Sequence, residues 1–242
     1  MKIYTYYQDT NFSTQQELIN LWKISWSRQG YEPIVLTLQD AKKHSYFETL
    51  NSEMRKIFKE ITGRQINDYG MSCWFRWLAY ATQEDEKFYV SDYDAINVNF
   101  PITEPSVKLH LMDGECPFFA SGTPTQFENL CKSFVEISNE RIDILKQQAN
   151  HYHDQEFLEF NRVALTRSLD VTLSRDRDFI GCMYDPVKQS LVQRPHIPVK
   201  NHQVCHISSQ NAFEIKSQYS QYKNHDRHKL RLMIVKDLLE IT

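Results

Sequence analysis

Apolar and aromatic residues open the chain in a β-rich run, and the run then gives way to helical spacing. Residues 2–7 (KIYTYY) are typical of a strand, and in the next segment, STQQELINLWKISWSRQG, leucines and tryptophans share one helical face. Gly30 ends this helix, and EPIVLTL at 32–38 again favours a strand. The first 38 residues therefore predict strand, helix and strand, a spacing that suits a parallel βαβ unit.

Helical and strand-like segments keep alternating along the rest of the chain. Residues from about 46 to 81 have a helical pattern, and KFYVS is a short apolar strand that leads directly into Asp92. The later segments are, in order, short strands with a turn at 110–124, an amphipathic helix through 127–145, a helix from 153, a strand within 194–210 and a basic helix over the last 30 residues. This alternation predicts an α/β sandwich of helices around a mixed, mainly parallel central sheet.

Length and composition fit one ordinary globular domain over 1–242. Apolar residues make up 41% and charged residues 24%, close to the average, so neither disorder nor a coiled coil is indicated. The net charge of −3 provides no broad basic footprint for nucleic acid. Five scattered cysteines without a CxxC pair are typical of reduced thiols. Neither a signal peptide nor a run of about 20 apolar residues is evident, so we expect a cytoplasmic protein without a membrane span.

The segment FYVSDYDAI sets Asp92 and Asp94 one residue apart immediately after an apolar strand. Two carboxylates at a strand end can converge on one hard cation, which can bridge phosphate oxygens and neutralise a departing diphosphate. Ligands of open α/β sheets also gather beyond the carboxyl ends of strands. The alternative is an ordinary polar turn without a metal. With 15 aspartates in 242 residues, about one D-x-D pair is expected by chance, so the pair alone does not establish a site. A second pair, Asp176 and Asp178, has an arginine between its acids and favours a salt-bridged surface turn.

Taken in order, four segments resemble the GT-A type glycosyltransferases, especially those related to glycosyltransferase family eight. In that group a strand ends in D-x-D, a later segment carries N-[AS]-G, D-Q-x-x-L-N follows, and a late strand ends in histidine. The counterparts here are FYVSDYDAI at 88–96, FFASGTP at 118–124, HDQEFLEFN at 153–161 and QVCHISS at 203–209. The resemblance implies a metal-dependent transferase, retaining in its stereochemistry, that moves a sugar from a nucleotide diphosphate, with UDP favoured, to a hydroxyl.

The same resemblance assigns the metal and donor residues. It implies that Asp92, Asp94 and His206 bind Mn²⁺ or Mg²⁺, and an imidazole beside two carboxylates fits manganese somewhat better. A hydrogen-bonded structural histidine is the alternative for His206. Residues 1–100 would form the nucleotide-sugar-binding half and residues 101–242 the acceptor-binding half with the C-terminal helical segment. The donor-binding residues implied are Tyr4, Tyr6, Arg76, Asp92, Tyr93, Ser121 and Gly122.

Each donor residue also has a plain structural interpretation. The planar guanidinium of Arg76 suits a sugar hydroxyl or a phosphate, but a salt bridge on a helix would explain it equally. One of Tyr4 and Tyr6, which leave the first strand on the same side, would stack on the base unless both are core residues. The side chain of Tyr93, between the acids, is expected to point the other way and pack.

Asp154 and Gln155 are the catalytic residues that the resemblance implies. Asp154 would deprotonate the acceptor in an inverting enzyme, or position substrate and stabilise developing charge in a retaining one; a helix N-cap is the alternative. This sequence departs from the family at three points. Ala120 replaces asparagine before Ser121, only Asn161 is available for the asparagine of the D-Q motif, and no G-x-K-P follows His206. Candidate substitutes for the missing lysine are Lys216, Lys223, Arg227 and Lys229.

Other functions remain open on the sequence alone. A sugar-nucleotide nucleotidyltransferase would share the metal chemistry, but YYQDTNFST lacks its Gly-rich basic loop. A catalytically silent protein of the same fold could bind a glycan or a partner. The acceptor could be a glycan, a protein or a modified base in nucleic acid, toward which the basic segment KNHDRHKLR could make phosphate contacts. His151 and His153 form a His-x-His pair, yet a further spaced histidine and acid pattern, as zinc hydrolases need, is missing.

Overall fold

The computed structural model describes most of the 242 residues. The described residues are 1–9, 13–112, 117–149, 151–173, 183–185, 190–192, 203–208, 212, 216–217, 223–224 and 226–241, and the side chains of 13–14, 183–185 and 190–192 are not described. The second aspartate pair, Asp176 and Asp178, lies outside these residues. Everything that follows concerns the described part of the chain.

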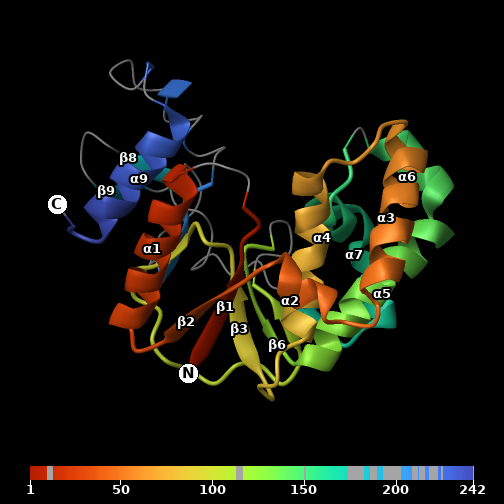
Figure 1. Ribbon diagram of the computed structural model, residues 1–242, viewed down its shortest axis with the longest axis horizontal. Helices are drawn as coiled ribbons and strands as arrows, with labels where there is room; N and C mark the ends of the chain where they lie inside the picture. Colours follow the sequence, from red (N-terminus) through yellow and green to blue (C-terminus); the bar gives the residue numbers. More distant parts are fainter. Residues whose placement is uncertain are drawn as a thin grey trace.

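A six-stranded mixed sheet forms the centre of the molecule (Figure 1). Its strand order is β2-β1-β3-β6-β5-β7, with parallel pairing of β1 with β2, β1 with β3 and β5 with β7, and antiparallel pairing of β6 with both β3 and β5. The strands are β1 (Lys2–Tyr6), β2 (Glu32–Leu36), β3 (Phe88–Ser91), β5 (Leu109–Leu111), β6 (Phe119–Gly122) and β7 (Val171–Leu173). The predicted α/β class with a mixed sheet is confirmed, as is the parallel βαβ start of the chain.

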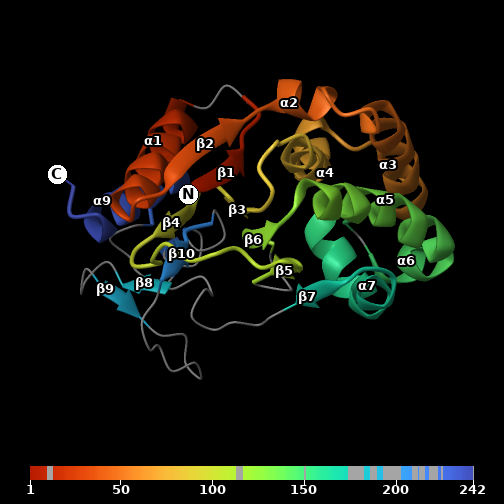
Figure 2. The ribbon, with the colours of Figure 1, turned by 90° about the horizontal axis from the view of Figure 1, so that it is seen from below.

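Two small two-stranded sheets lie beside the central one. β4 (Ala95–Asn97) pairs antiparallel with β10 (Val204–His206), and β8 (Met183–Asp185) pairs antiparallel with β9 (Ser190–Val192). Because β4 follows β3 closely in the chain, this pairing brings the late strand β10 back to the end of β3 (Figure 2). The division of the chain at residue 100 stays a prediction; strands from both sides of it, β3 and β6, are neighbours in the central sheet.

Helices cover both faces of the central sheet. α1 and α9 pack together on one face, and the larger group from α2 to α7 covers the other (Figures 1 and 2). The first pair is α1 (Ser13–Arg28) and α9 (Arg227–Leu238). The second group is α2 (Leu38–Lys42), α3 (Phe47–Thr62), α4 (Asp68–Ala81), α5 (Pro124–Glu140), α6 (Ile142–Gln148) and α7 (Asp154–Ser168).

The predicted helical region from 46 to 81 is two helices rather than one continuous stretch. α3 ends at Gly63, whose φ of 69° is in the left-handed region that glycine adopts without strain. Asn67 then caps α4, because its side-chain oxygen accepts a hydrogen bond from the backbone N–H of Gly70 at 2.8 Å. The loop between the two helices therefore has a defined end on each side.

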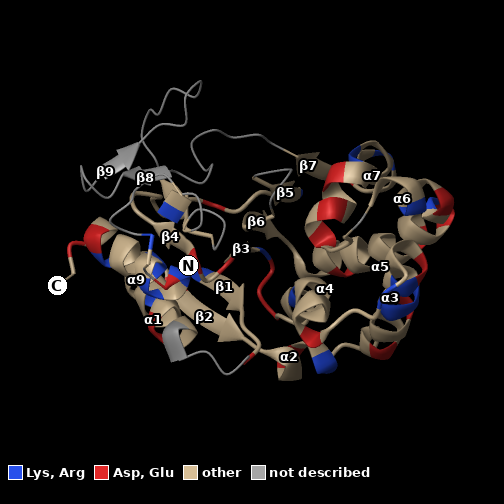
Figure 3. Cartoon of the chain, turned by 90° about the horizontal axis from the view of Figure 1, so that it is seen from above, with Lys and Arg blue, Asp and Glu red and all other residues tan. Residues whose placement is uncertain are grey.

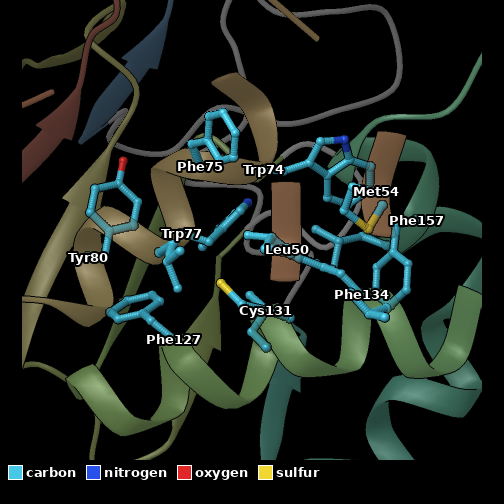
Figure 4. Packing of buried hydrophobic residues seen from close by; sticks show 14 of the residues in the cluster. Leu50, Met54, Trp74, Phe75, Trp77, Tyr80, Phe127, Cys131, Phe134 and Phe157 are labelled. Carbon is cyan, nitrogen blue, oxygen red and sulfur yellow. The ribbon is translucent and has the colours of Figure 1, made fainter. Parts of the chain in front are cut away.

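The aromatic residues form two cores, one on each face of the sheet. On the larger face the rings of Trp74 and Phe134 are 4.9 Å apart, as are those of Phe134 and Phe157, both edge to face (Figure 4). On the other face Trp22 and Trp26 are fully buried between α1 and the sheet. All four tryptophans, at 22, 26, 74 and 77, are core residues with no exposed surface, as the sequence predicts.

Acidic and basic residues are both present on the helices of each face of the sheet (Figure 3). Within the described residues, none of the helices is both long enough and apolar enough to span a bilayer.

Candidate functional site

The DYD segment is a tight turn between β3 and β4. The backbone N–H of Asp92 donates to Phe118 at 2.8 Å, which continues the pairing with β6, and the N–H of Ala95 returns to the carbonyl of Asp92 at 3.0 Å. The turn interrupts the alternation of the strand, so both carboxylates reach the same cavity. Asp92 and Asp94 thus lie at the carboxyl end of a sheet strand, as predicted.

Two tryptophans of α1 form hydrogen bonds to the residues on either side of the DYD turn. The indole N–H of Trp22 donates to the hydroxyl of Ser91 at 2.9 Å, and that of Trp26 donates to the carbonyl of Ala95 at 3.1 Å. Both indoles are buried, so each needs such a partner. These core residues therefore also fix the two ends of the turn that carries the acids.

Strand pairing brings His206 to the aspartates. His206 lies opposite Ala95 in the β10–β4 register, and the N–H of Ile207 donates to the carbonyl of Asp94 at 2.8 Å. The imidazole stacks on the ring of Phe118 at 4.6 Å, with its Nε2 3.3 Å from Oδ1 of Asp94. A residue 112 positions downstream of Asp94 in the sequence is thereby held beside it.

Asp92, Asp94 and His206 form a cluster that suits one divalent cation. One ligand atom from each residue lies within 4.8 Å of the other two, and no other such triad occurs among the described residues. Neighbouring ligands bonded to one small divalent ion at about 2.1 Å are about 3 Å apart, so the three side chains would have to draw closer together to bind it. Two carboxylates with one imidazole are donors that Mn²⁺ and Mg²⁺ accept, the imidazole favouring manganese.

Arg76 joins Asp92 to Asp154. One end of its guanidinium donates to Asp92, and its Nε and Nη2 donate to Oδ2 of Asp154 at 2.9 and 2.5 Å. The same oxygen accepts the indole N–H of Trp77 at 2.7 Å. Asp154 is 3% exposed and is the first residue of α7, but its carboxylate binds these side chains rather than capping the helix. The N-capping alternative is therefore wrong, and Asp154 orients Arg76.

Arg231 of α9 makes the corresponding contact with Asp94. Its guanidinium pairs with Oδ2 of Asp94, and its Nε donates to the carbonyl of Ile207 at 2.8 Å. The arginine side chain is 3% exposed. Each acid of the pair therefore has its own arginine partner, the half-buried Arg76 for Asp92 and the buried Arg231 for Asp94.

The surroundings of Asp92 and Asp94 shift the pKa values of the two carboxyl groups in opposite directions. Burial, followed by the neighbouring charge of Asp94, raises the pKa of Asp92 even though Arg76 opposes the shift. Burial would also raise the pKa of Asp94, but His206 and Arg231 outweigh it and hold that pKa below its ordinary value. For Arg76, burial would lower the pKa, and the carboxylates of Asp154 and Asp92 instead raise it well above its ordinary value. A cation that replaces the arginines as partner would stabilise both carboxylates.

A cavity of about 280 Å³ opens above this cluster. Tyr93 and Gln155 line it along with four acids and two arginines, and Tyr6 lines the adjoining hollow of about 120 Å³ on the β1 side. The structure therefore brings together the predicted residues Tyr6, Arg76, Asp92, Tyr93, Asp94, Asp154, Gln155 and His206. Tyr93 is half-buried, meets Tyr7 edge to face and packs against the core on the α1 face, as expected, and it also borders the cavity.

Three predicted donor residues are not at this site. Tyr4 is buried against Phe88, and its hydroxyl bonds to Asp85 in the loop before β3. Gly122 pairs with Phe88, the first residue of β3, and Ser121 with the next, because β6 runs antiparallel to β3. At about 3.3 Å per residue, Gly122 is roughly 10 Å along the sheet from the Asp92 end. Pro117 and Phe118 reach the site instead.

The residues suggested as counterparts of glycosyltransferase motif residues absent from this sequence also lie outside the cavity. Asn161 is fully buried, where its amide donates to the carbonyl of Phe157 and its oxygen accepts from Arg141. Among the basic residues described near the C-terminus, the one that lines the cavity is Arg231, rather than Lys216, Lys223, Arg227 or Lys229.

Sequence reasoning missed Arg231, Trp77 as a partner of Asp154, and Tyr69, which borders both hollows. The basic character of the last 30 residues was a signal for an arginine, but the pattern does not say which one turns inward. His151 and His153 have ring centroids 4.0 Å apart, yet they belong to no metal-ligand triad within the described residues.

Comparison with protein-family models and with curated proteins returned no match for this chain.

Proposed function

We propose that this chain is a metal-dependent glycosyltransferase of the GT-A type that transfers a sugar from a nucleotide diphosphate to a hydroxyl. The observation that carries the proposal is the convergence of Asp92, Asp94 and His206 at the carboxyl end of β3, facing a cavity. The mixed α/β sheet and the order of the motifs along the chain are compatible with that fold.

In this proposal Asp92, Asp94 and His206 would hold Mn²⁺ or Mg²⁺, which would supply charge neutralisation for the departing diphosphate. Arg76 and Arg231 flank the carboxylates and supply fixed positive charge beside the phosphate oxygens. Asp154 keeps the guanidinium of Arg76 in place, while Tyr6 and Tyr93 offer rings next to the donor. The bond from the anomeric carbon to the diphosphate breaks and the diphosphate keeps the electron pair. The acceptor oxygen bonds to that carbon while its proton passes to the departing diphosphate oxygen.

The first test is metal binding followed by donor turnover. Mn²⁺ titrated into the protein by calorimetry should bind at one site, and a panel of UDP-sugars with Mn²⁺ should show slow donor hydrolysis. Asp94→Asn keeps the size of the side chain but removes the charge, so it should lose Mn²⁺ binding and reduce turnover by several orders of magnitude. Asp170→Asn is the matched control, because Asp170 is exposed and pairs with Lys108 far from the cavity.

The same assays separate the competing functions. Turnover of a nucleoside triphosphate and a sugar phosphate, with release of diphosphate, would indicate a nucleotidyltransferase instead. Donor binding without any turnover, unchanged in Asp94→Asn, would indicate a catalytically silent protein. No binding and no turnover with any donor would refute the proposal.

A further inference from the structure

A second cavity of about 240 Å³ lies directly beside the first. It is formed by α3, the loop between α3 and α4, and the segment that enters α7, and its walls include Phe58, Arg64, Gln65, Asn67, Tyr69 and His153. Tyr69 and His153 also line the first cavity. A molecule in the second cavity would thus meet a molecule in the first at these two side chains.

The loop that forms one wall is firmly anchored. Arg55 of α3 donates to the carbonyl of Ile66 at 3.2 Å and to the side chain of Asn51 at 2.9 Å, and it pairs with Asp68 at 3.3 Å. The side-chain oxygen of Asn67 accepts the hydrogen bond that caps α4, which leaves the amide NH₂ group of Asn67 to bind a ligand. The backbone of this wall is therefore held by α3 on one side and by the start of α4 on the other.

The opposite wall is a stack of flat rings. His153 lies parallel to Phe58 with 6.2 Å between ring centroids and an interplanar angle of 15°, and His151 meets it edge to face at 4.0 Å. Gly70 makes room for this packing, since a Cβ there would come within 3.1 Å of Nε2 of His153. Phe58 is buried, His153 is half-buried, and His151 and Tyr69 are exposed, and all four line the cavity with the amides of Gln65 and Asn67.

The two cavities differ in charge. The first contains the carboxylates of Asp92, Asp94, Asp154 and Glu156, whereas no carboxylate lines the second among the residues that the structure describes. A metal-bound diphosphate therefore matches the first cavity only. The second offers ring faces for apolar C–H surfaces and amides that both donate and accept hydrogen bonds, which is the combination that a polyhydroxylated ring requires.

The volume of the second cavity limits the size of the ligand that it can hold. A volume of about 240 Å³ is below the range of roughly 300–1,000 Å³ typical of sites for drug-sized ligands. The cavity has room for one small ring.

We propose that this second cavity is the acceptor subsite and that the acceptor is a saccharide, one of whose rings packs between Phe58 and Tyr69 and hydrogen-bonds to Gln65 and Asn67. The inference rests on the proposed transferase function and names the acceptor class for it. The reacting hydroxyl lies at the boundary of the two cavities, where His153 is the positioning residue. That hydroxyl forms the new bond to the anomeric carbon.

The test separates acceptor binding from donor turnover. Methyl glycosides of common hexoses are added to the protein and followed by saturation-transfer NMR without donor. They are then added to an assay of UDP-sugars with Mn²⁺, in which sugar transfer and donor hydrolysis are measured together. Gln65→Ala removes an amide that lines the second cavity and not the first. Gln147→Ala, an exposed glutamine on α6 outside both cavities, is the matched control.

We expect at least one glycoside to bind and to accept sugar. Gln65→Ala should weaken its binding and raise its KM about fivefold or more, the loss of one hydrogen bond, and lower the ratio of transfer to hydrolysis, while Gln147→Ala changes neither. Donor hydrolysis with no response to any glycoside, or transfer to peptide or oligonucleotide acceptors alone, would overturn the saccharide assignment and leave the transferase function standing. Equal glycoside binding in wild type and Gln65→Ala would overturn the subsite. Absence of donor turnover would refute the transferase function itself, while the NMR measurement would still test the cavity.

Discussion

The guanidinium of Arg231 pairs with the carboxylate of Asp94 although 137 residues separate them in the sequence. Both side chains are largely buried, with exposed fractions of 3% and 13%. Removing one member of a buried pair strands the other charge, at a cost of about 3–5 kcal/mol. This contact therefore ties the C-terminal helix to the candidate metal site.

We expect Arg231→Met to lower the free energy of unfolding by about 3–5 kcal/mol in the presence of a chelator. Mn²⁺ should recover much of that loss, because the cation takes over as partner of Asp94. Urea denaturation with and without Mn²⁺ measures both effects. Arg28→Met is the control, since Arg28 also anchors α9, through the carbonyl of Leu239 at 2.6 Å, but away from Asp94. An equal gain from Mn²⁺ in both variants would contradict this account.

Asp154→Asn should weaken both stability and donor turnover. The change keeps the shape but removes the charge that holds Nε and Nη2 of Arg76, so we expect a loss of about 3–5 kcal/mol. Arg76 would no longer be aimed at the donor, and turnover should fall with it. Glu159→Gln, an exposed acid on the same helix, should change neither. Wild-type turnover by Asp154→Asn would show that orienting Arg76 is unnecessary.

His153 should make the protein less stable on acidification. Burial, with the nearby His151 adding to it, lowers the pKa of His153 below its ordinary value of 6.5. As the pH falls below 6.5 the unfolded chain gains a proton at this position before the folded chain does, so folding stability decreases until the lowered pKa is passed. Above pH 6.5 this contribution is complete.

Denaturation curves of wild type and His153→Gln at pH about 7.5 and about 5.5 isolate the contribution of that one residue. The loss of stability between the two pH values should be smaller in His153→Gln, because the variant lacks the imidazole that burial keeps neutral. An identical loss in the two proteins would count against a lowered pKa.

Gly70→Ala should disturb the second cavity. Alanine is favoured over glycine in a helix by about 1 kcal/mol, but the added Cβ would lie 2.6 Å from Cγ1 of Ile66 and 3.1 Å from Nε2 of His153. We expect the clash to dominate, with lower stability and a raised KM for methyl glycosides. Gly63→Ala is the matched comparison: its φ of 69° costs about 1–2 kcal/mol, yet nothing lies within 4 Å. If both variants raise that KM equally, the effect comes from stability alone.

Much of the architecture was predictable because it depends on the local spacing of apolar residues along the chain. The βαβ start and the strand that ends in His206 follow from apolar spacing over short windows. The helical character of 127–145 follows in the same way, but the structure divides the expected single helix into α5 and α6 at Arg141. The position of Asp92 and Asp94 at a strand end follows in the same way, since the apolar run of β3 stops immediately before them. Local spacing also placed the four tryptophans in the core.

Strand direction, by contrast, decided which of the predicted donor residues reach the site. A short strand has the same sequence pattern whether it runs parallel or antiparallel to its neighbour. Because β6 is antiparallel to β3, Ser121 and Gly122 lie toward the far end from Asp92, and Pro117 and Phe118 take their place. No local pattern contains that information, since pairing direction is set by how distant segments pack.

The charge partners were decided by the tertiary structure as well. The sequence by itself determined that an acid pair follows a buried strand and that arginines are available on helices. Only the folded chain determined that Arg76 joins Asp92 to Asp154, and that Arg231 rather than a neighbouring lysine pairs with Asp94. The physical reason is that a buried carboxylate needs a partner at contact distance, and contact between residues 78 or 137 positions apart arises only when their elements pack together.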